Sequence, residues 1–384
     1  MNPWRGLKGL PRSIWVLSLS TLVNRMGTMA VFFLTLYLVE GRGWRAEDAA
    51  SAMFAYGAGA MAVAPFSGRI SDHVGHRRVL LASLVLSGLL VLLVPLAERP
   101  WQLLPLVAVW SAVTQAFWPS SMALITDLST PETRKQAFVL HRLAANLGLS
   151  LGPALGGWIA HHSFAAIFVI DGLTTLAGAA VLALGVAPSP RAPHEGAPSE
   201  SGWGDRRLLY LLGAMLPALA VFTQLSGGAL SLWVSRDLGH GPGRFGLVFT
   251  FNTLLILLLE VALNQAMAHW RHGLQLAAGA GLIALGFGLT GLGGHLGMLV
   301  LTIVLWTFGE MILLPASSDA VAALAPADRR GEYMGLYSFA WTVAMTLGPW
   351  LGLLVYAKAG PQLLWAGAGG VALLSAAAML RFRP

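Results

Sequence analysis

Several ionisable residues stand inside long apolar stretches of this chain, where a charge is costly to bury and is usually functional. Glu310 and Asp171 each carry a carboxyl group that can bind and release a proton in such surroundings, and protonation removes the cost of burying the charge. We predict Glu310 as the main proton-coupling residue and Asp171 as a second. Arg25 would either neutralise a carboxylate or hold an anionic group. We also predict Arg142 as a member of the proton-coupling set. A purely structural ion pair between Glu310 and one of these arginines is the alternative.

The chain shows no sequence pattern of an enzyme active site. It has no H-E-x-x-H zinc motif, no G-x-S-x-G nucleophile turn and no phosphate-binding P-loop. It also has no cysteine, which excludes disulfides, thiolate metal sites and cysteine nucleophiles. His161 and His162 are adjacent, and neighbouring side chains on a helix diverge, so they make a poor metal site. We therefore predict no enzyme activity, no metal and no cofactor.

The composition is typical of a membrane protein. Of 384 residues, 56% are hydrophobic and only 11% are charged, against about 25% charged in a soluble domain. The net charge of +7 does not indicate nucleic-acid binding, because the basic residues lie in short loops between apolar segments. There they act as topology signals and as contacts for anionic lipid. We expect no removable signal peptide at the start of the chain.

About twelve apolar segments are long enough to cross a bilayer, which takes about 20 residues per helix. Their residues do not alternate between polar and apolar, as in the strands of a membrane barrel. We therefore predict an all-α polytopic membrane protein with twelve transmembrane helices. The predicted segments are 13–39, 47–67, 79–96, 102–125, 138–160, 164–186, 208–234, 245–267, 274–292, 297–320, 333–356 and 363–380.

Basic residues also predict which side of the membrane each loop faces. With a cytoplasmic N-terminus, about 16 lysines and arginines lie on the cytoplasmic side and about 6 outside. Both termini are therefore predicted to be cytoplasmic. Residues 188–207 are rich in Pro, Ser and Gly, which is a linker composition. This linker separates a predicted N-terminal six-helix bundle, 1–187, from a C-terminal one, 208–384.

The two predicted bundles are repeats of one another. A single offset of 196 residues, without gaps, superposes several turn and helix-bending positions, which rarely arises by chance. Each half is therefore expected to hold six helices in the same order. The coinciding positions are Pro119 and Pro315, Gly152-Pro153 and Gly348-Pro349, Gly156 and Gly352, and the turns 38–44 and 234–240.

The short basic loop between the second and third segments carries a distinct pattern. Residues 68–80 read GRISDHVGHRRVL, with two glycines that permit a sharp turn and an aspartate able to accept hydrogen bonds. This loop resembles the G-x-x-x-D-x-x-G-x-R-R signature of the major facilitator superfamily. The resemblance implies two bundles around a central cavity and a loop that latches them together on the cytoplasmic side. The latch residues would be Gly68, Asp72, Gly75, Arg77 and Arg78.

Two histidines distinguish this loop from the usual signature. His73 and His76 stand where arginine or lysine is common. Because histidine titrates at about pH 6.5, we predict a latch that is weaker or sensitive to pH. Neutral, solvated histidines are the alternative.

The fifth segment carries the small-residue run Gly148-x-x-x-Gly152-Pro153-x-x-Gly156-Gly157. Glycines on one face let helices pack closely, and proline bends a helix by removing a backbone hydrogen bond. The run resembles the corresponding stretch of twelve-helix drug:proton antiporters. Small-residue packing also occurs in other polytopic proteins, and this is the alternative.

The fourth segment departs from the drug-antiporter pattern. In many of these antiporters an arginine stands three residues before a Gln-Gly pair, whereas this chain has Ala112 before Gln115. Arg25 or Arg142 would then take over the electrostatic role. In contrast, Glu310 follows a glycine in the middle of the tenth segment, which resembles another feature of these antiporters.

The resemblance places the substrate cavity between the first, fourth, seventh and tenth segments. Aromatic walls with few polar groups suit large amphipathic ligands, which bind by contact area and cation–π interaction. Several of the 14 tryptophans could instead belong to belts at the membrane interfaces. The predicted cavity residues are Asn24, Arg25, Phe32, Phe33, Trp110, Gln115, Trp118, Asn146, Phe222, Gln224, Trp306, Phe308 and Glu310.

Together these features predict a secondary active transporter that works by alternating access. The leading interpretation is proton-coupled export of hydrophobic or cationic drug-like compounds. Arg25 favours the alternative, proton-coupled transport of an anionic or zwitterionic metabolite, peptide or lipid on the same fold. The expected partners are a small-molecule substrate, protons and membrane lipids, without nucleic acid. We expect a monomer in the cytoplasmic (inner) membrane.

Overall fold

Helices make up nearly all of the chain in the computed structural model, and no strand occurs among the residues that it describes. Most of the predicted linker, residues 188–203, lies outside the described residues, and so does the side chain of Asp72. The described residues are 9–130, 133–187, 204–225, 228–239, 241–267, 269–293, 296–326 and 330–382.

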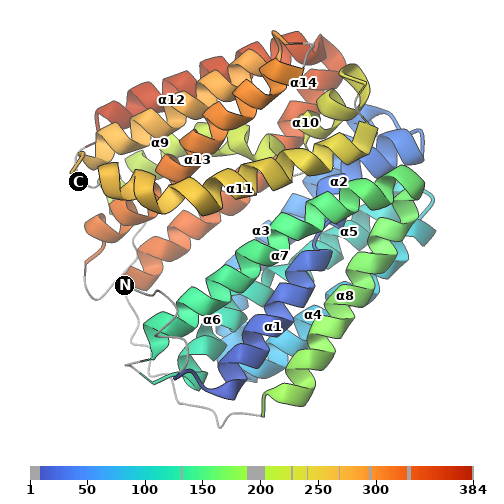
Figure 1. Cartoon of the computed structure of the whole chain (residues 1–384), viewed down its shortest axis with the longest axis vertical. Helices are drawn as coiled ribbons and strands as arrows, with labels where there is room; N and C mark the ends of the chain where they lie inside the picture. Colours follow the sequence, from blue (N-terminus) through green and yellow to red (C-terminus); the bar gives the residue numbers. More distant parts are fainter. Residues whose placement is uncertain are drawn as a thin grey trace. The chain divides into compact units, whose positions relative to one another are not determined.

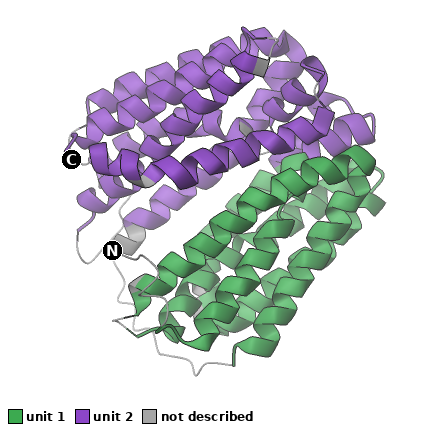
Figure 2. Cartoon of the chain, in the orientation of Figure 1, with its two compact units in different colours: residues 1–33, 55–196 green, residues 34–54, 197–384 purple. Residues whose placement is uncertain are grey.

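The helices form two compact units (Figure 2). Unit 1 comprises Met1–Phe33 and Ala55–Gly196, and unit 2 comprises Leu34–Phe54 and Ala197–Pro384. The division into bundles 1–187 and 208–384 stays a prediction. In the first half of the chain the helices are α1 (Arg12–Gly27), α2 (Ala30–Leu36), α3 (Ala46–Val74), α4 (His76–Leu93), α5 (Pro100–Gln115), α6 (Phe117–Leu128), α7 (Arg134–His162) and α8 (Phe164–Gly185). In the second half they are α9 (Arg206–Phe222), α10 (Ala229–Leu232), α11 (Gly241–Met267), α12 (His272–Thr290), α13 (Leu296–Leu324) and α14 (Arg330–Leu380) (Figure 1).

The internal repeat extends to irregularities of the backbone. Two π-helices, η2 (Tyr37–Gly41) and η6 (Trp233–Asp237), lie at the offset of 196 residues found in the sequence. Each is followed by a glycine in the left-handed region, Gly43 with φ 69° and Gly239 with φ 64°. Since π-helices are rare, their recurrence at one offset indicates that the two halves share a backbone path as well as a sequence pattern.

Helix α14 contains a break that corresponds to the gap between α7 and α8. Gly360 has φ 82° and is followed by Pro361, so the helical hydrogen bonds cannot continue through this point. A straight helix of 51 residues would be about 75 Å long, far more than the roughly 30 Å of a bilayer core. The break therefore divides α14 into two arms, and the first begins 196 residues after the start of α7.

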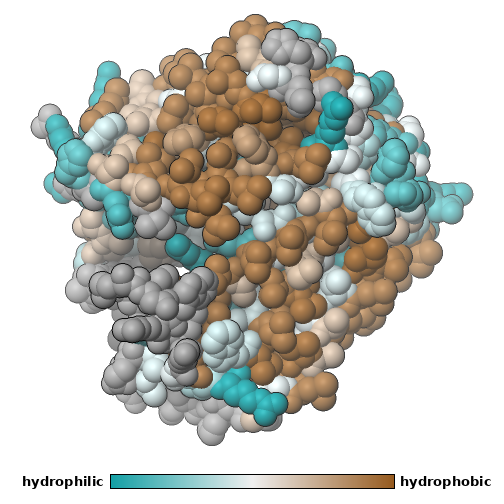
Figure 3. All heavy atoms as spheres, viewed as in Figure 1, coloured by the Kyte–Doolittle hydropathy of each residue, from teal (hydrophilic) through white to brown (hydrophobic). Residues whose placement is uncertain are grey.

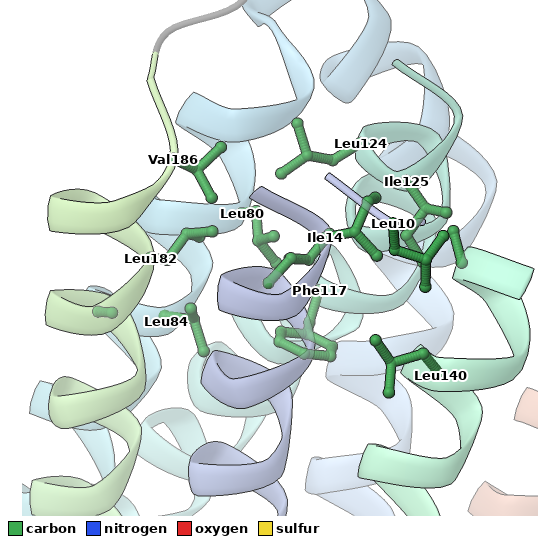
Figure 4. Close-up of a cluster of buried hydrophobic side chains, with 13 residues drawn as sticks. Leu10, Ile14, Leu80, Leu84, Phe117, Leu124, Ile125, Leu140, Leu182 and Val186 are labelled. Atoms are coloured by element: carbon green, nitrogen blue, oxygen red, sulfur yellow. The ribbon is translucent and has the colours of Figure 1, made fainter. Parts of the chain in front are cut away.

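A cluster of buried aliphatic side chains holds one end of unit 1 together (Figure 4). Ile14 of α1 and Leu182 of α8 are completely buried, and they meet Leu80 of α4 and Ile125 of α6. Apolar residues on the outer surfaces are as hydrophobic as those of the cluster. Hydrophobicity therefore does not decide which side chains are buried, and the fit between side chains does. Helices in a membrane associate through close packing because lipid offers no hydrophobic driving force between them.

Large apolar side chains also cover the outside of the helices (Figure 3). Leu184 is 91% exposed and Leu258 is 73% exposed, which a water-soluble surface would not favour. Among the described residues, nine helical segments are long and apolar enough to cross a membrane. The prediction of an all-α polytopic membrane protein is thus confirmed, whereas the count of twelve spans stays a prediction.

Candidate functional site

The first apolar segment is broken between α1 and α2, and Asp171 of α8 lies at the break. The backbone N–H groups of Met29 and Ala30 donate hydrogen bonds of 3.2 and 2.9 Å to Oδ2 of Asp171. Ala30 is the first residue of α2, whose first amides have no partner within the helix, and the N–H of Met29, just before it, also donates to the carbonyl oxygen of Gly27 at 2.6 Å. Asp171 is only 6% exposed, and Thr175 donates a further, longer hydrogen bond of 3.4 Å to its Oδ1. The carboxylate therefore caps a helix that belongs to another segment.

Arg25 lies in the last turn of α1, just before this break. Its guanidinium carbon lies 5.2 Å from the ring centre of Phe117 and 5.5 Å from that of Trp118. Its charge also interacts with Asp171 and Tyr56. Among the described residues, the guanidinium makes no hydrogen bond or ion pair. Its N–H donors are thus available to an acceptor on a ligand, while the two rings satisfy the face of the cation.

A buried histidine completes the surroundings of Arg25. Nε2 of His141 lies 2.9 Å from Oγ of Ser121, and the imidazole lies 5.8 Å from the Trp118 ring. Nδ1 of His141 is buried and has no hydrogen-bond partner among the described residues. Tyr56 packs edge-on against Trp110, with ring centres 5.1 Å apart. Unit 1 thus gathers aromatic rings, an arginine and a histidine around the end of α1.

The predicted glycine face of α7 packs against α1 at the same place. A Cβ atom on Gly148 would lie 2.6 Å from Cβ of Arg25, and one on Gly152 would lie 3.0 Å from the carbonyl oxygen of Arg25. A Cβ atom on Gly156 would lie 2.8 Å from the ring of Phe33. Any larger residue at Gly148 or Gly156 would push the helices apart. Pro153 lies inside α7 between these contacts, and Gly157 is buried.

Other residues predicted for unit 1 differ in their surroundings. Asn24 donates a hydrogen bond of 3.1 Å to the Thr175 hydroxyl, which itself bonds Asp171, so it faces α8. Phe32, like Phe33, is buried. Gln115 is partly buried, Trp118 is 43% exposed, and Arg142 and Asn146 are exposed on one side of α7.

Glu310 in unit 2 lies on α13 and is partly buried against α11. The side-chain amide nitrogen of Asn252 donates to Oε2 of Glu310 at 2.8 Å and to the Thr307 hydroxyl at 3.1 Å. The charge of Glu260 also acts on Glu310. Within the described part of unit 2, Glu310 forms no ion pair with a basic side chain. Asn252 was not singled out in the sequence, although it is the single side-chain amide within the apolar run 247–259, and this was the signal for it.

The remaining predicted residues of unit 2 pack within their own bundle. Gln224 follows α9, donates a hydrogen bond to the carbonyl of Gly348 and accepts one of 3.1 Å from the N–H of Ala229. Trp306 is only 1% exposed, and its ring centre lies 5.7 Å from that of Phe287. Phe222 is buried edge-on against Trp341, at 6.2 Å between ring centres, and Phe308 is partly buried.

Comparison with known proteins identifies the family of the chain. The family model described as Major Facilitator Superfamily matches residues 17–226 and 211–384. The chain is a member of the Major Facilitator Superfamily. It is therefore a membrane transporter and not an enzyme, as predicted from the loop 68–80 and from the absence of catalytic motifs.

Two curated transporters are similar to this chain in sequence over most of their length. The uncharacterised MFS-type transporter YqjV of Bacillus subtilis is 23% identical over 365 residues, covering 92% of this chain and 87% of YqjV. The multidrug resistance protein MdtH of Cronobacter sakazakii is 25% identical over 362 residues, covering 90% of this chain and 87% of MdtH. A solved structure of a POT family transporter in complex with a thioalcohol-conjugated peptide is similar with a TM-score of 0.82 at 17% identity, covering 99% of this chain and 98% of that one. That structural likeness shows the fold alone.

In the predicted latch of this transporter, the turn is made by Gly75, with φ 103°. The side chain of the predicted aspartate, Asp72, lies outside the described residues, and Arg77 has its described contacts with the end of α8. Its Nε donates to the carbonyl of Val186 at 2.6 Å and its Nη2 to that of Ala183 at 2.9 Å. A cation at these carbonyls stabilises the C-terminal end of α8. The latch between the two halves stays a prediction.

His76 links three helix ends near the same loop. Its Nδ1 lies 2.9 Å from Oγ of Ser71, and its Nε2 lies 3.8 Å from Oδ2 of Asp127. The hypothesis of a pH-sensitive loop stays a prediction. Gly68 lies inside α3 with open space around it, and Arg78 is exposed.

Asp205 caps the N-terminus of α9 in the transporter, at the end of the linker. Its Oδ1 accepts from the N–H of Arg207 at 2.8 Å, and its Oδ2 accepts from the Tyr333 hydroxyl at 2.7 Å. The hydrogen bond from Tyr333 lowers the pKa of Asp205 below its usual value. No three described His, Asp or Glu residues come together as a set of metal ligands.

Proposed function

We propose that this transporter exports hydrophobic or cationic drug-like compounds in exchange for protons, by alternating access. It acts as a monomer in the lipid of the inner membrane, with both termini in the cytoplasm. The observation that carries the proposal is Glu310, a partly buried carboxyl group whose hydrogen bond comes from the neutral amide of Asn252. A carboxylate held without a basic partner in its own bundle is costly, and a proton removes that cost.

Protonation would therefore change which conformation of the protein is favoured. An amide N–H bonds a carboxylate more strongly than a neutral acid, so Asn252 favours the charged form of Glu310. Loading and release of one proton then alternate the charge of the site once in each cycle. A coupling residue needs this kind of balance, because a group locked in one charge state cannot respond to a gradient.

The identity of the compounds is supported by the relatives and by the rings in unit 1. A relative with 25% identity over most of both chains bears the name of a multidrug resistance protein. The rings of Trp110, Tyr56 and Trp118 supply aromatic surface, which binds amphipathic compounds by area. The close-packed glycines of α7 are consistent with the drug-antiporter resemblance.

Dye transport in inverted membrane vesicles tests this function. Vesicles with an imposed pH gradient and a fluorescent lipophilic cation would be compared for the wild type, Glu310→Gln and Glu98→Gln. Glu98 is exposed, so the same substitution there controls for the loss of any carboxylate. We expect gradient-driven uptake by the wild type and by Glu98→Gln, and none by Glu310→Gln. Uptake that survives in Glu310→Gln would overturn Glu310 as the coupling site.

A second candidate function rests on Arg25. Its guanidinium is stacked on Phe117 and Trp118 but has no hydrogen-bond acceptor among the described residues, and an anionic or zwitterionic substrate would supply one. A dye bearing a carboxylate, offered in the same vesicles, distinguishes the two functions. If the wild type moves this dye but no lipophilic cation, and Arg25→Gln abolishes the movement, the second candidate replaces the first.

A further inference from the structure

Both halves of the chain break their first apolar segment at the same position of the repeat. α1 is followed by Thr28 and the start of α2, whereas α9 is followed by the short 3₁₀ turn η5 (Thr223–Leu225), which contains Gln224, and then by α10. Thr28 and Gln224 are related by the offset of 196 residues. In both units the break packs on a glycine of the repeat-related helix, Gly152 in unit 1 and Gly348 in unit 2. The two breaks are therefore equivalent positions of the repeat.

The two breaks are capped by groups of different chemistry. In unit 1 Asp171, a carboxylate that reaches across from α8, accepts from the N–H of Ala30, the first residue of α2, and shares the N–H of Met29 with the carbonyl oxygen of Gly27. In unit 2 the N–H of Ala229 is held by the side-chain amide of Gln224, which belongs to the broken segment itself. The residue 196 positions after Asp171 is Gly367, so unit 2 has no counterpart of the carboxylate. One cap can bind a proton and the other cannot.

From this asymmetry we propose that Asp171 is a proton-responsive cap that holds the first segment of unit 1 in its broken geometry. Binding of one proton to the carboxylate leaves a neutral acid, whose oxygens accept the two backbone hydrogen bonds more weakly. The break then loosens, and Arg25, four residues before Met29, changes position with it. The equivalent break in unit 2 keeps its geometry at every pH at which the protein is folded.

The charged groups around Asp171 agree with this role. Arg25 of α1 and Tyr56 of α3 are the described ionisable residues whose charges act on it. Helix α4 meets this part of α8 through Gly88 and Leu92, which carry no charge. His141 and Arg142 of α7 have no hydrogen bond or ion pair with Asp171 in the described structure. Protonation of Asp171 therefore also weakens its attraction for Arg25, which adds to the loosening of the break.

The absence of cysteine in the chain offers a direct test. Ala30→Cys places a single thiol at the first residue of α2, and Ala229→Cys places one at the first residue of α10. Both alanines are completely buried and donate their N–H to a side-chain oxygen, of Asp171 and Gln224 respectively. The rate of labelling by a maleimide reports how often each thiol is exposed. The ratio of the two rates cancels the part of the pH dependence that both thiols share.

We expect the ratio of Ala30→Cys to Ala229→Cys labelling to rise about fivefold as the pH is lowered, since a charge-assisted hydrogen bond is about twice as strong as a neutral one. In the Asp171→Asn background an amide oxygen still caps α2 but cannot titrate, so the ratio should be independent of pH. A ratio that is flat in the wild-type background, or that changes equally with Asp171→Asn, would overturn the inference. Met29→Cys serves as the probe if Ala30→Cys does not fold.

This inference builds on the proposed proton coupling, but its test needs no transport. Labelling of the purified protein therefore separates the two. If Glu310→Gln still moves dye with the gradient and the labelling ratio still depends on pH, the coupling site is wrong and the cap is right. If Glu310→Gln abolishes uptake and the ratio is flat, Asp171 is a structural cap only, and the proposed function stands.

Discussion

Asn252 of α11 and Glu310 of α13 are joined by a hydrogen bond of 2.8 Å from the amide nitrogen to Oε2. The same nitrogen reaches the Thr307 hydroxyl at 3.1 Å, so both of its protons are directed toward α13. This nitrogen of Asn252 can only donate a hydrogen bond, and a carboxylate can only accept one. Protonated Glu310 would also carry an O–H donor, for which the nitrogen offers no acceptor. The amide thus balances the burial cost that favours the protonated form.

Removing this donor should shift the pH dependence of transport. In Asn252→Ala the charged form of Glu310 loses its hydrogen bond, so the acid form is favoured and the pH of half-maximal transport should rise by about one unit. The measurement is initial dye uptake as a function of pH. Asn264→Ala is the matched control, because Asn264 lies on the same helix but donates only to the carbonyls of Glu260 and Met311. Equal shifts in both variants would contradict the role given to Asn252.

Substitution of the α7 glycine nearest Arg25 should destabilise unit 1. In Gly148→Ala the new Cβ atom would lie 2.6 Å from Cβ of Arg25 and 2.8 Å from the carbonyl oxygen of Leu22, so α1 and α7 must separate. Overpacking of this kind costs about 1–3 kcal/mol. Thermal unfolding in detergent measures the loss. Gly213→Ala, where no atom lies within 4 Å of the new Cβ, should be neutral or slightly stabilising.

Loss of the Gln224 side chain should loosen the break in unit 2. Gln224→Ala leaves the N–H of Ala229 without its acceptor and removes the hydrogen bond to the carbonyl of Gly348, which costs about 2 kcal/mol in the free energy of unfolding. Gln224→Glu keeps an acceptor for Ala229 but cannot donate to Gly348 when ionised. If the cap on Ala229 contributes more to stability than the hydrogen bond to Gly348, chemical denaturation of the purified protein should find Gln224→Ala less stable than Gln224→Glu. Gln275→Ala, which removes one hydrogen bond to Met267, is the milder comparison.

The hydrogen bond from Tyr333 to Asp205 should stabilise the protein at every pH at which Asp205 is ionised. Because the folded pKa of Asp205 lies below its ordinary value of 3.8, this contribution is present above that value and is lost as the pH falls through the folded pKa. Tyr333→Phe should lower the melting temperature at neutral pH by no more than about 2 °C, since Asp205 is only partly buried. The difference should vanish in acid. Tyr337→Phe, whose hydroxyl pairs with neutral Ser317 at 2.8 Å, should show no such pH dependence.

Features that depend on local sequence were predictable. The segment 138–160, predicted from hydropathy, lies inside α7, and the segment 164–186 nearly coincides with α8. The repeat offset also predicts that the turn after η2 recurs after η6. Glycine spacing also predicted that α7 would pack closely, because a face without side chains has few other uses in a membrane helix. The loop 68–80 was sufficient to predict the family. None of these features requires knowledge of which helices are neighbours.

The partners of the polar residues were decided only by the tertiary structure. Asp171 was predicted to bind protons, but its hydrogen bonds to Met29 and Ala30 join residues about 140 positions apart, a pairing that no local pattern encodes. Asn252 was missed for the same reason, since its importance lies in facing Glu310. Helices that are apolar on every side do not indicate which face turns inward. The sequence determined the membrane helices and their repeat, whereas the rotation of each helix decided which rare polar groups meet.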